Sequence, residues 1–393
     1  MQHISKKRVV LPAFVLAVLG LIFAAYTAHP SYAGGQDGSR IYDSVPDPFP
    51  ANYPSLGYQA TSTKEFGDHI QFAGTGRNLS SVVVGMSSWA CENNEGWNSG
   101  NCLTPTPNAT FTHPITLNLY NVDTSGLHPQ PGTLIKSVTQ TFSMPYRPSP
   151  DPTCATQTNW RNPSDNKCYS GYAFTIEFDL SSENITVPNE IIFGIAYNTN
   201  THGYNPIGSP GPYDALNVGV ADPSQFFGSG VGTNVDHDDV FLNSTWAGAY
   251  SSGNSTPTGV FRWDGPCCGG YVPVARFNIE PADVSLSISN SLICGGPQTI
   301  SIDFSNVYDL YGYEFEVEYD VNKVNAVGAF NNSWYDTTGA IKPWNATCSA
   351  GTCRFSVAKE LGTPVSGAGT VATITLTPVA SGSFTAKIKN VTL

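Results

Sequence analysis

The sequence predicts an all-β protein made of two β-sandwich or jelly-roll domains that follow an N-terminal signal peptide. Many segments alternate apolar and polar residues with a period of two, the pattern of a strand with one buried face and one solvent-facing side. These segments follow one another with no helix signal between them. The connections are long and rich in turn-forming residues, and the chain holds 38 Gly and 29 Pro.

The N-terminus has the organisation of an export signal. Three basic residues, Lys6 to Arg8, precede an apolar run from Val9 to Ala25, and small residues offer a cleavage point after Ala33. We therefore expect residues 1–33 to be a signal peptide. An uncleaved membrane anchor is the alternative, because the apolar run is at the short limit for a membrane span. Residues 34–45 are expected to form a flexible leader.

Composition and charge narrow the classes of partner. Charged residues make up 12% of the chain, about half of the usual share. The predicted signal peptide holds three positive charges and no negative one, so its removal takes the net charge from -12 to about -15. This balance argues against nucleic acid and anionic lipid as partners. We expect a secreted or cell-surface protein. It would meet a membrane only through an uncleaved signal peptide or through a C-terminal anchor missing from this sequence.

Residues 46–280 are predicted to form the first domain, a jelly-roll-like sandwich of about ten strands. Ile115 to Val122 and Ala173 to Leu180 alternate clearly. Ile191 to Tyr197 is continuously apolar, as a strand covered on both faces would be. The other strand candidates are Val82 to Met86, Leu134 to Phe142, Asp214 to Val220, Val240 to Leu242, Gly259 to Trp263 and Val272 to Ile279.

Residues 284–393 are predicted to form the second domain, a smaller sandwich after a short hinge at residues 280–283. The segment Tyr313 to Asp320 alternates without a break, with aromatic and aliphatic residues on one side and carboxylates on the other. Successive carboxylates of the row would lie about 7 Å apart on the solvent side. The same alternation recurs at Ile300 to Phe304, Phe355 to Val357, Ala372 to Leu376 and Phe384 to Ile388.

Six of the nine cysteines form three pairs that are close in sequence. Export permits disulfides, so we expect each pair to close a loop. One of Cys267 and Cys268 could reach Cys294, which leaves one thiol over. A zinc site is the alternative, although the spacings match no ligand pattern. The three pairs are Cys91 with Cys102, Cys154 with Cys168, and Cys348 with Cys353.

The densest polar cluster of the first domain runs from Asp236 to Asp239. Asp236, Asp238 and Asp239 are candidate ligands for calcium, the one cofactor that the sequence suggests. The cluster lacks the Gly and the terminal Glu of an EF-hand loop, so a solvated turn before Val240 is the alternative.

The tryptophans of the first domain offer a second candidate site. Exposed rings can stack on sugars, which would make a carbohydrate-binding surface, whereas the alternative is that these rings fill the core or cover loops. The tryptophans concerned are Trp89, Trp97, Trp160, Trp246 and Trp263.

No catalytic motif is present, so we predict no catalytic residue and expect that the protein is not an enzyme. Glycoside hydrolysis needs two carboxylates close together, and Glu177, Asp236 and Asp264 are candidates that sequence cannot bring together. A polysaccharide hydrolase with an accessory module and a purely structural envelope protein therefore remain the alternatives.

Three segments of the second domain resemble cohesin modules. Asn306 to Val327 resembles the second and third cohesin strands, and Cys353 to Glu360 and Gly369 to Leu393 resemble later ones. The resemblance covers about 110 of the 393 residues. It implies a nine-stranded jelly roll, in a superfamily shared with carbohydrate-binding modules, that binds without catalysis. It implies a dockerin-like protein or a polysaccharide as partner, often in polysaccharide breakdown at a cell surface.

The resemblance also implies a docking face. Gly312 and Glu314 fall where type I cohesins commonly present Asn and Asp to dockerin, and Lys359 falls where they use an acidic residue. Such changes alter partner choice more than stability. The family has a final strand that pairs with the first, so we expect this module to lack its last strand. The implied partner-binding residues are Gly312, Glu314, Glu316, Glu318 and Lys359.

Two other roles are open for the carboxylate row. If the strand order of cohesins holds, Lys387 and Lys389 lie on the adjacent strand and form cross-strand ion pairs with the row. The carboxylates could instead bind calcium.

The first domain has a resemblance of its own. Leu119 to Ile135 resembles a stretch of jelly-roll modules in exported bacterial proteins, and this stretch predicts no activity.

Overall fold

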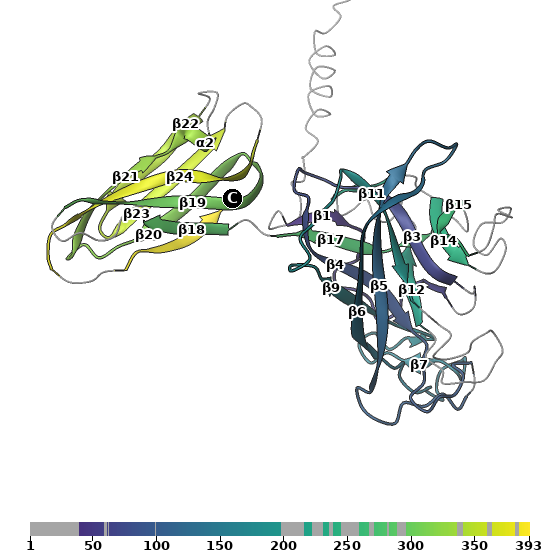
Figure 1. The fold of residues 1–393 in the computed structure, drawn as a ribbon. Coiled ribbons are helices and arrows are strands. Elements are labelled where there is room, and N and C mark those ends of the chain that lie inside the picture. Colours follow the sequence, from purple (N-terminus) through teal and green to yellow (C-terminus); the bar gives the residue numbers. More distant parts are fainter. Residues whose placement is uncertain are drawn as a thin grey trace, which may run out of the picture. The chain divides into compact units, whose positions relative to one another are not determined.

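The computed structural model shows an almost entirely β protein, as the alternating sequence predicts (Figure 1). Among the described residues, every strand pairing is antiparallel, and the hydrophobic residues form two large, separate cores. The predicted signal peptide, residues 1–33, lies outside the described residues. These are residues 39–58, 61, 63–98, 100–197, 216–221, 231–235, 239–244, 259–266, 271–280, 283–288, 296–335, 341–359, 364–381 and 385–393.

One sheet of the first sandwich, the β4 sheet, has eight strands. Its strand order is β1-β17-β4-β12-β16. In addition, β9 and β10 pair with β4, and β2 pairs with β12. The strands are β1 (Arg40–Asp43), β2 (Ser55–Gly57), β4 (Asn78–Ser88), β9 (Tyr172–Asp179), β10 (Ile185–Thr186), β12 (Leu216–Ala221), β16 (Val272–Pro273) and β17 (Ala275–Ile279).

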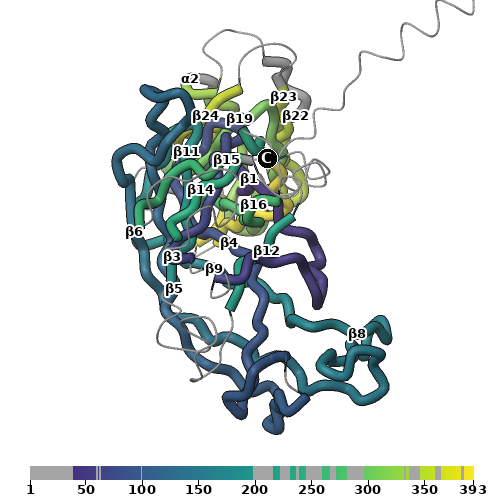
Figure 2. The backbone as a smooth tube through the Cα atoms, turned by 90° about the vertical axis from the view of Figure 1, so that its right-hand side faces the viewer, coloured from purple at the N-terminus to yellow at the C-terminus, as the bar shows by residue number. Residues whose placement is uncertain are grey.

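The opposing sheet, the β3 sheet, has seven strands in the order β15-β14-β3-β11-β5-β6, with β13 beside β3. The strands are β3 (Thr63–Gln71), β5 (Thr110–Asp123), β6 (Gln130–Pro145), β11 (Glu190–Ala196), β13 (Thr233–Asn234), β14 (Asp239–Ser244) and β15 (Arg262–Pro266). A further two-stranded sheet, β7 (Trp160–Arg161) with β8 (Cys168–Tyr169), lies in a long loop that extends from the first sandwich (Figure 2).

The first core lies between the β4 and β3 sheets and takes residues from both, such as Val84 and Phe277 from one and Phe66 and Phe193 from the other. Ile192 is also fully buried, although it is not among the residues of this core cluster and points away from its neighbour Phe193. The prediction that the strand around Ile191 is covered on both faces is therefore confirmed.

The boundaries of the first sandwich differ from the prediction in three places. Ile41 and Tyr42 of β1 are buried in the core, so the expectation of a flexible leader is wrong for residues 40–43. The single strand expected over residues 272–279 is two strands, β16 and β17, which pair with different neighbours. The strand expected from Gly259 begins at Arg262, because Gly259 has a positive φ of 89° that a strand does not allow.

The second sandwich has two four-stranded sheets. The β19 sheet has the order β18-β19-β24-β21, and the β20 sheet has the order β22-β23-β20-β25. The strands are β18 (Asp283–Ile288), β19 (Gln298–Leu310), β20 (Gly312–Glu318), β21 (Val324–Phe330), β22 (Ile341–Ser349), β23 (Thr352–Lys359), β24 (Val365–Pro378) and β25 (Lys387–Thr392).

The strand β20 has the two faces that its alternation predicts. Tyr313, Phe315 and Val317 are buried in the second core, and Glu314 is exposed. Phe315 stacks on Phe355 of the neighbouring β23, with 4.9 Å between ring centroids. The outward face of β20 is therefore held in place by an aromatic core directly beneath it.

One short helix, α2 (Asn332–Tyr335), was not predicted. The Oδ1 atom of Asn331 accepts hydrogen bonds from the backbone N–H and the hydroxyl of Ser333. This is the capping that starts a helix, and four residues are too few to leave a periodic pattern in the sequence. Among the described residues, none of the helices has the length and apolar character that a membrane crossing requires.

Candidate functional site

The candidate site is the solvent-facing side of the β20 sheet, which we call the charged face. Strand register sets its composition. On β20, Glu314 lies opposite Ser356 of β23 and Glu316 lies opposite Arg354. On the other side of β20, β25 brings two lysines to the same carboxylate row. The charged face consists of Glu314, Glu316, Glu318, Arg354, Lys387 and Lys389.

Glu316 is the most strongly held carboxylate of the charged face. The Arg354 Nε atom donates to its Oε1 atom at 2.5 Å, and the Asn390 Nδ2 atom donates to its Oε2 atom at 2.8 Å. These two hydrogen bonds, from Arg354 first and then from Asn390, lower the pKa of Glu316 from its ordinary value. Both oxygens of this carboxylate are therefore occupied by neighbours within the module.

Glu318 is also paired, though more loosely. The Lys389 Nζ atom donates to its Oε1 atom at 2.6 Å, and both side chains are nearly half exposed. Exposed pairs of this kind contribute at most about 1 kcal/mol, since water screens them. Lys387 and Lys389 do lie on the adjacent strand, and Lys387 is opposite Glu318, but the ion pair forms with Lys389.

Glu314 differs from its two neighbours. It is exposed, and among the described residues no hydrogen bond or ion pair reaches its carboxylate. A shift of register in the β20–β25 pairing lies between Glu314 and Glu316, and it places Thr392 rather than a lysine opposite Glu314. Of the three glutamates on β20, Glu314 is thus the one for which the described residues show no partner.

Gly312 and Lys359, the other two predicted partner-binding residues, lie at the ends of β20 and β23. At Gly312, an added Cβ atom would lie 2.9 Å from the Val357 carbonyl oxygen, so a side chain there would crowd the neighbouring strand. Lys359 ends β23 opposite Ile341, but its side chain lies outside the described part. The role of Gly312 and Lys359 in partner binding stays a prediction.

Sequence reasoning missed two residues of this site, Arg354 and Asn390. Both hold Glu316, from strands that are 38 and 74 positions away in the chain. Arg354 has a signal that could have found it, because it sits at a polar position of the alternating segment Cys353 to Val357.

The acidic cluster of the first sandwich is only partly described. Asp236 and Asp238 lie outside the described residues. Asp239 begins β14, and its Oδ2 atom accepts a hydrogen bond of 2.6 Å from the Trp263 Nε1 atom. Within the described ranges, no group of three or more His, Cys, Asp or Glu side chains is placed to hold a metal ion.

The carboxylates considered for hydrolysis do not meet. Glu177 is on β9 in the β4 sheet, and Asp264 is on β15 in the β3 sheet. Glu177 is exposed, whereas Asp264 is fully buried with its Oδ1 atom 3.6 Å from the Arg262 guanidinium. The third candidate, Asp236, lies outside the described residues.

Three disulfides join Cys91 to Cys102, Cys154 to Cys168, and Cys348 to Cys353. These are the three pairs that are close in sequence. Cys267, Cys268 and Cys294 lie outside the described residues.

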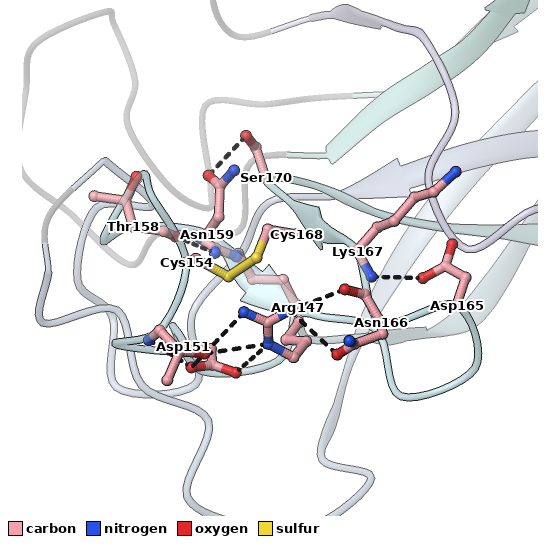
Figure 3. Close-up of a disulfide and its surroundings, with 12 residues drawn as sticks. Arg147, Asp151, Cys154, Thr158, Asn159, Asp165, Asn166, Lys167, Cys168 and Ser170 are labelled. Atoms are coloured by element: carbon pink, nitrogen blue, oxygen red, sulfur yellow. Dashed lines mark hydrogen bonds and ion pairs between the residues drawn. A yellow bond between two sulfur atoms is a disulfide. The ribbon is translucent and has the colours of Figure 1, made fainter.

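The disulfide Cys154–Cys168 closes a loop that carries β7 and β8 (Figure 3). The hydroxyl of Ser170, just beyond the bridge, donates to Asn159 in this loop, and the Lys167 backbone N–H donates to Asp165 (Figure 3). The loop is therefore an ordered, cross-linked element.

Three of the tryptophans pack in or beside the two loops closed by the Cys91–Cys102 and Cys154–Cys168 disulfides. Trp160 is buried and donates from Nε1 to the Gly171 carbonyl oxygen at 2.8 Å. Trp89 and Trp97 meet edge to face at 4.6 Å between ring centroids and pack on the Cys91–Cys102 disulfide. Trp246 lies outside the described residues, and Trp263 is half-buried on β15.

Comparison with known proteins gives limited matches. No family model matches the chain, and no curated protein matches it. Among solved structures, a crystal structure of a CaDoc0917–CaCohA2 complex is similar, with 17% identity, a TM-score of 0.23, and 27% of this chain and 82% of that chain covered. A type II cohesin dyad from the adaptor ScaA scaffoldin of Acetivibrio cellulolyticus is similar with 11% identity, a TM-score of 0.23, and 84% of this chain and 85% of that chain covered. Scores this low do not by themselves establish a shared fold.

Proposed function

We propose that the second sandwich is a cohesin-like, non-catalytic module that binds a dockerin-like protein through the charged face. The resemblance of Asn306 to Val327 and of the later strands to cohesin sequences supports this proposal. The single observation that carries it is the state of the carboxylate row on β20. Glu316 and Glu318 are held by neighbours within the module, while Glu314 is exposed and without an ion pair among the described residues.

A charged face of this kind suits a protein partner. The row of three glutamates on β20 is flanked by Arg354 on β23 and by Lys387 and Lys389 on β25, so the face is patterned rather than strongly acidic. Patterned charge contributes mainly to the choice of partner and to the rate of association. A partner that places a cation at Glu314 and acceptors at Lys387 would match the pattern.

The proposal includes export of the protein and a place at the cell surface or outside the cell, among proteins of polysaccharide breakdown. The basic and apolar organisation of residues 1–33 supports export, as do the three disulfides, which persist in oxidising compartments. N-terminal sequencing of the protein recovered outside the producing cells tests it. We expect a mature chain that begins at Gly34, and protein found wholly inside the cells with Met1 retained contradicts export.

Binding of purified dockerin modules to the immobilised full chain tests the docking role. We expect at least one dockerin to bind, and Glu314→Lys to weaken that binding at least tenfold because it reverses the available charge. Glu177→Lys is the matched control, since Glu177 is also an exposed carboxylate on a strand face but lies in the first sandwich. Absence of binding to every dockerin, or equal effects of the two substitutions, would overturn the proposal.

A further inference from the structure

The outer face of the β3 sheet, the side away from the first core, carries one continuous row of residues in register. Trp263 of β15 lies opposite Phe241 of β14, and Phe241 lies opposite Gly67 of β3. Gly67 in turn lies opposite Gly194 of β11, which lies opposite Asn118 of β5. The row crosses five strands, a span of roughly 19 Å at the usual strand spacing.

Two glycines at the centre of this row leave space above the sheet, and two side chains fill it. A Cβ atom at Gly194 would lie 2.3 Å from the Glu65 Oε1 atom. A Cβ atom at Gly67 would lie 2.9 Å from the Phe261 Cζ atom, besides clashing with the Phe193 carbonyl. The Glu65 carboxylate and the Phe261 ring therefore lie directly over the glycine backbone.

Glu65 is a buried carboxylate with only one of its oxygens used. Its residue is 6% exposed. The Asn118 Nδ2 atom donates to Oε1 at 2.8 Å and the Tyr120 hydroxyl donates to the same oxygen at 3.0 Å. Among the described residues no donor reaches Oε2 and no cation pairs with this group. Burial raises the pKa of Glu65, and the two hydrogen bonds oppose that rise.

A buried carboxylate in this position destabilises the fold. Burying a carboxylate without a cation costs free energy that two hydrogen bonds only partly recover. An apolar side chain over Gly194 would cover the same surface at lower cost. The arrangement is therefore better explained by a ligand that donates to Oε2 than by stability.

Aromatic rings surround this carboxylate on the same outer face. The Tyr120 and Phe261 rings meet with 5.4 Å between centroids, and Phe241 lies 6.2 Å from Phe261. Trp263 stacks on His128 at 3.7 Å between centroids. Tyr120, Phe261 and Trp263 are each half-buried, so each ring keeps part of its surface accessible.

The β5–β6 hairpin joins the two ends of this face. The register of β5 with β6 shifts on both sides of Tyr120, which bends the hairpin. Beyond the bend, the Gln130 Oε1 atom accepts a hydrogen bond of 3.1 Å from the Trp263 backbone N–H, although β6 and β15 are at opposite ends of the sheet order. Polar and aromatic groups are thereby held in one fixed arrangement.

We propose that this outer face is a binding site for a neutral oligosaccharide, with Glu65, Asn118 and Tyr120 as its polar contacts and Phe261 and Trp263 as its ring surfaces. Sugars combine apolar ring faces, which pack on aromatic side chains, with hydroxyls that donate to carboxylates. The unpaired carboxylate disfavours an acidic sugar. The length of the row suits an oligosaccharide rather than a single sugar unit.

Titration of the full chain with soluble oligosaccharides tests the site. The probes are cellohexaose, xylohexaose, mannohexaose and laminarihexaose, with calorimetry and tryptophan fluorescence as readouts. We expect saturable binding of at least one probe, weakened at least tenfold by Glu65→Gln and by Trp263→Ala. Trp97→Ala, which changes a half-buried tryptophan in the disulfide loops, is the matched control and should bind within twofold of the unchanged protein.

Thermal melts establish that each variant folds, and Asn118→Ala replaces Glu65→Gln if the latter does not. Absence of binding to every probe overturns the proposal. So does binding that Glu65→Gln, Asn118→Ala and Trp263→Ala leave unchanged. A fluorescence response to choline in place of the sugars would mark a cation site, and release of reducing sugar would mark a hydrolase, and either result overturns it. These outcomes are independent of dockerin binding, which concerns the charged face.

Discussion

Glu316 illustrates how register decides the state of a single side chain. Its alternating position predicts only that it faces solvent, as Glu314 and Glu318 do. The structure adds that Arg354 and Asn390 occupy both of its oxygens, which lowers its pKa. A carboxylate held in this way contributes to folding stability only while it is ionised.

The lowered pKa of Glu316 predicts a pH dependence of stability. The contribution is complete above the ordinary pKa of 4.5 and is lost as the pH falls through the lower folded value. We expect Glu316→Gln to reduce the denaturation midpoint of the second sandwich at pH 7 and to have no effect well below the pKa. Urea melts at several pH values check this. Glu314→Gln is the control, and it should leave the denaturation midpoint unchanged both at pH 7 and at low pH.

Gly194 offers a second test of a single position. Gly194→Ala places a methyl group against the Glu65 carboxylate, so we expect a loss of stability of about 1–3 kcal/mol. Gly126→Ala is the control, because its Cβ atom would meet nothing closer than 3.6 Å, and its effect should stay within about 0.5 kcal/mol. Equal urea midpoints for the two variants would show that Glu65 does not lie over Gly194.

The long loops of the first sandwich behave as elements in their own right. Arg147 is fully buried between them and donates to the carbonyl oxygens of Trp97 and Thr158. Each loop is closed by its own disulfide, with Cys91 and Cys102 in one and Cys154 and Cys168 in the other. A guanidinium, two disulfides and three packed tryptophans thus stabilise these loops, together with the short β7–β8 pairing.

Loop length predicts how much each disulfide stabilises. The bridges Cys154–Cys168 and Cys348–Cys353 have sequence separations of 14 and 5 residues. Closing the longer loop restricts the unfolded chain more, so paired Cys→Ser changes should cost about 3 kcal/mol there and about 2 kcal/mol at the shorter bridge. Thermal melts of the two double variants check this order, and a greater loss at Cys348–Cys353 would contradict it.

The two large hydrophobic cores among the described residues share no residue. No described strand pairs between the sheets of one core and those of the other. Each core has its own pair of sheets and its own aromatic centre, around Phe193 and Phe277 in the first and Phe315 and Phe355 in the second. We therefore predict that the two sandwiches unfold separately.

Calorimetry of the full chain tests this prediction. We expect two transitions. Phe315→Ala should lower the temperature of one of them, because it reduces the unfolding free energy of the second sandwich by about 3–5 kcal/mol, and it should leave the other transition unchanged. Val327→Ala is the control, since Val327 is 68% exposed and its loss should cost less than about 0.5 kcal/mol. A single transition that Phe315→Ala shifts as a whole would contradict separate unfolding.

Much of the fold could be predicted from the sequence, because strand alternation is a local signal. The patterns of Tyr313 to Asp320 and of Ile191 to Tyr197 predict the burial that the structure shows for these strands. The candidate sites could be predicted only in part. No local pattern in the sequence marks Glu65, since its partners Asn118 and Tyr120 are 53 and 55 positions away. The sequence does not show whether Glu177 and Asp264 lie close together, because that depends on the sheets to which their strands belong.

The sequence by itself determined the all-β class, the inward and outward faces of the clearest strands and the carboxylate row of β20, because each depends only on neighbouring residues along one strand. The tertiary structure alone decided that Glu316 and Glu318 are held while Glu314 has no partner among the described residues, and that Glu65 lies over Gly194 and accepts a hydrogen bond from Tyr120. Those outcomes depend on which distant strands pair and in what register, and a shift by one residue would turn every side chain to the opposite face.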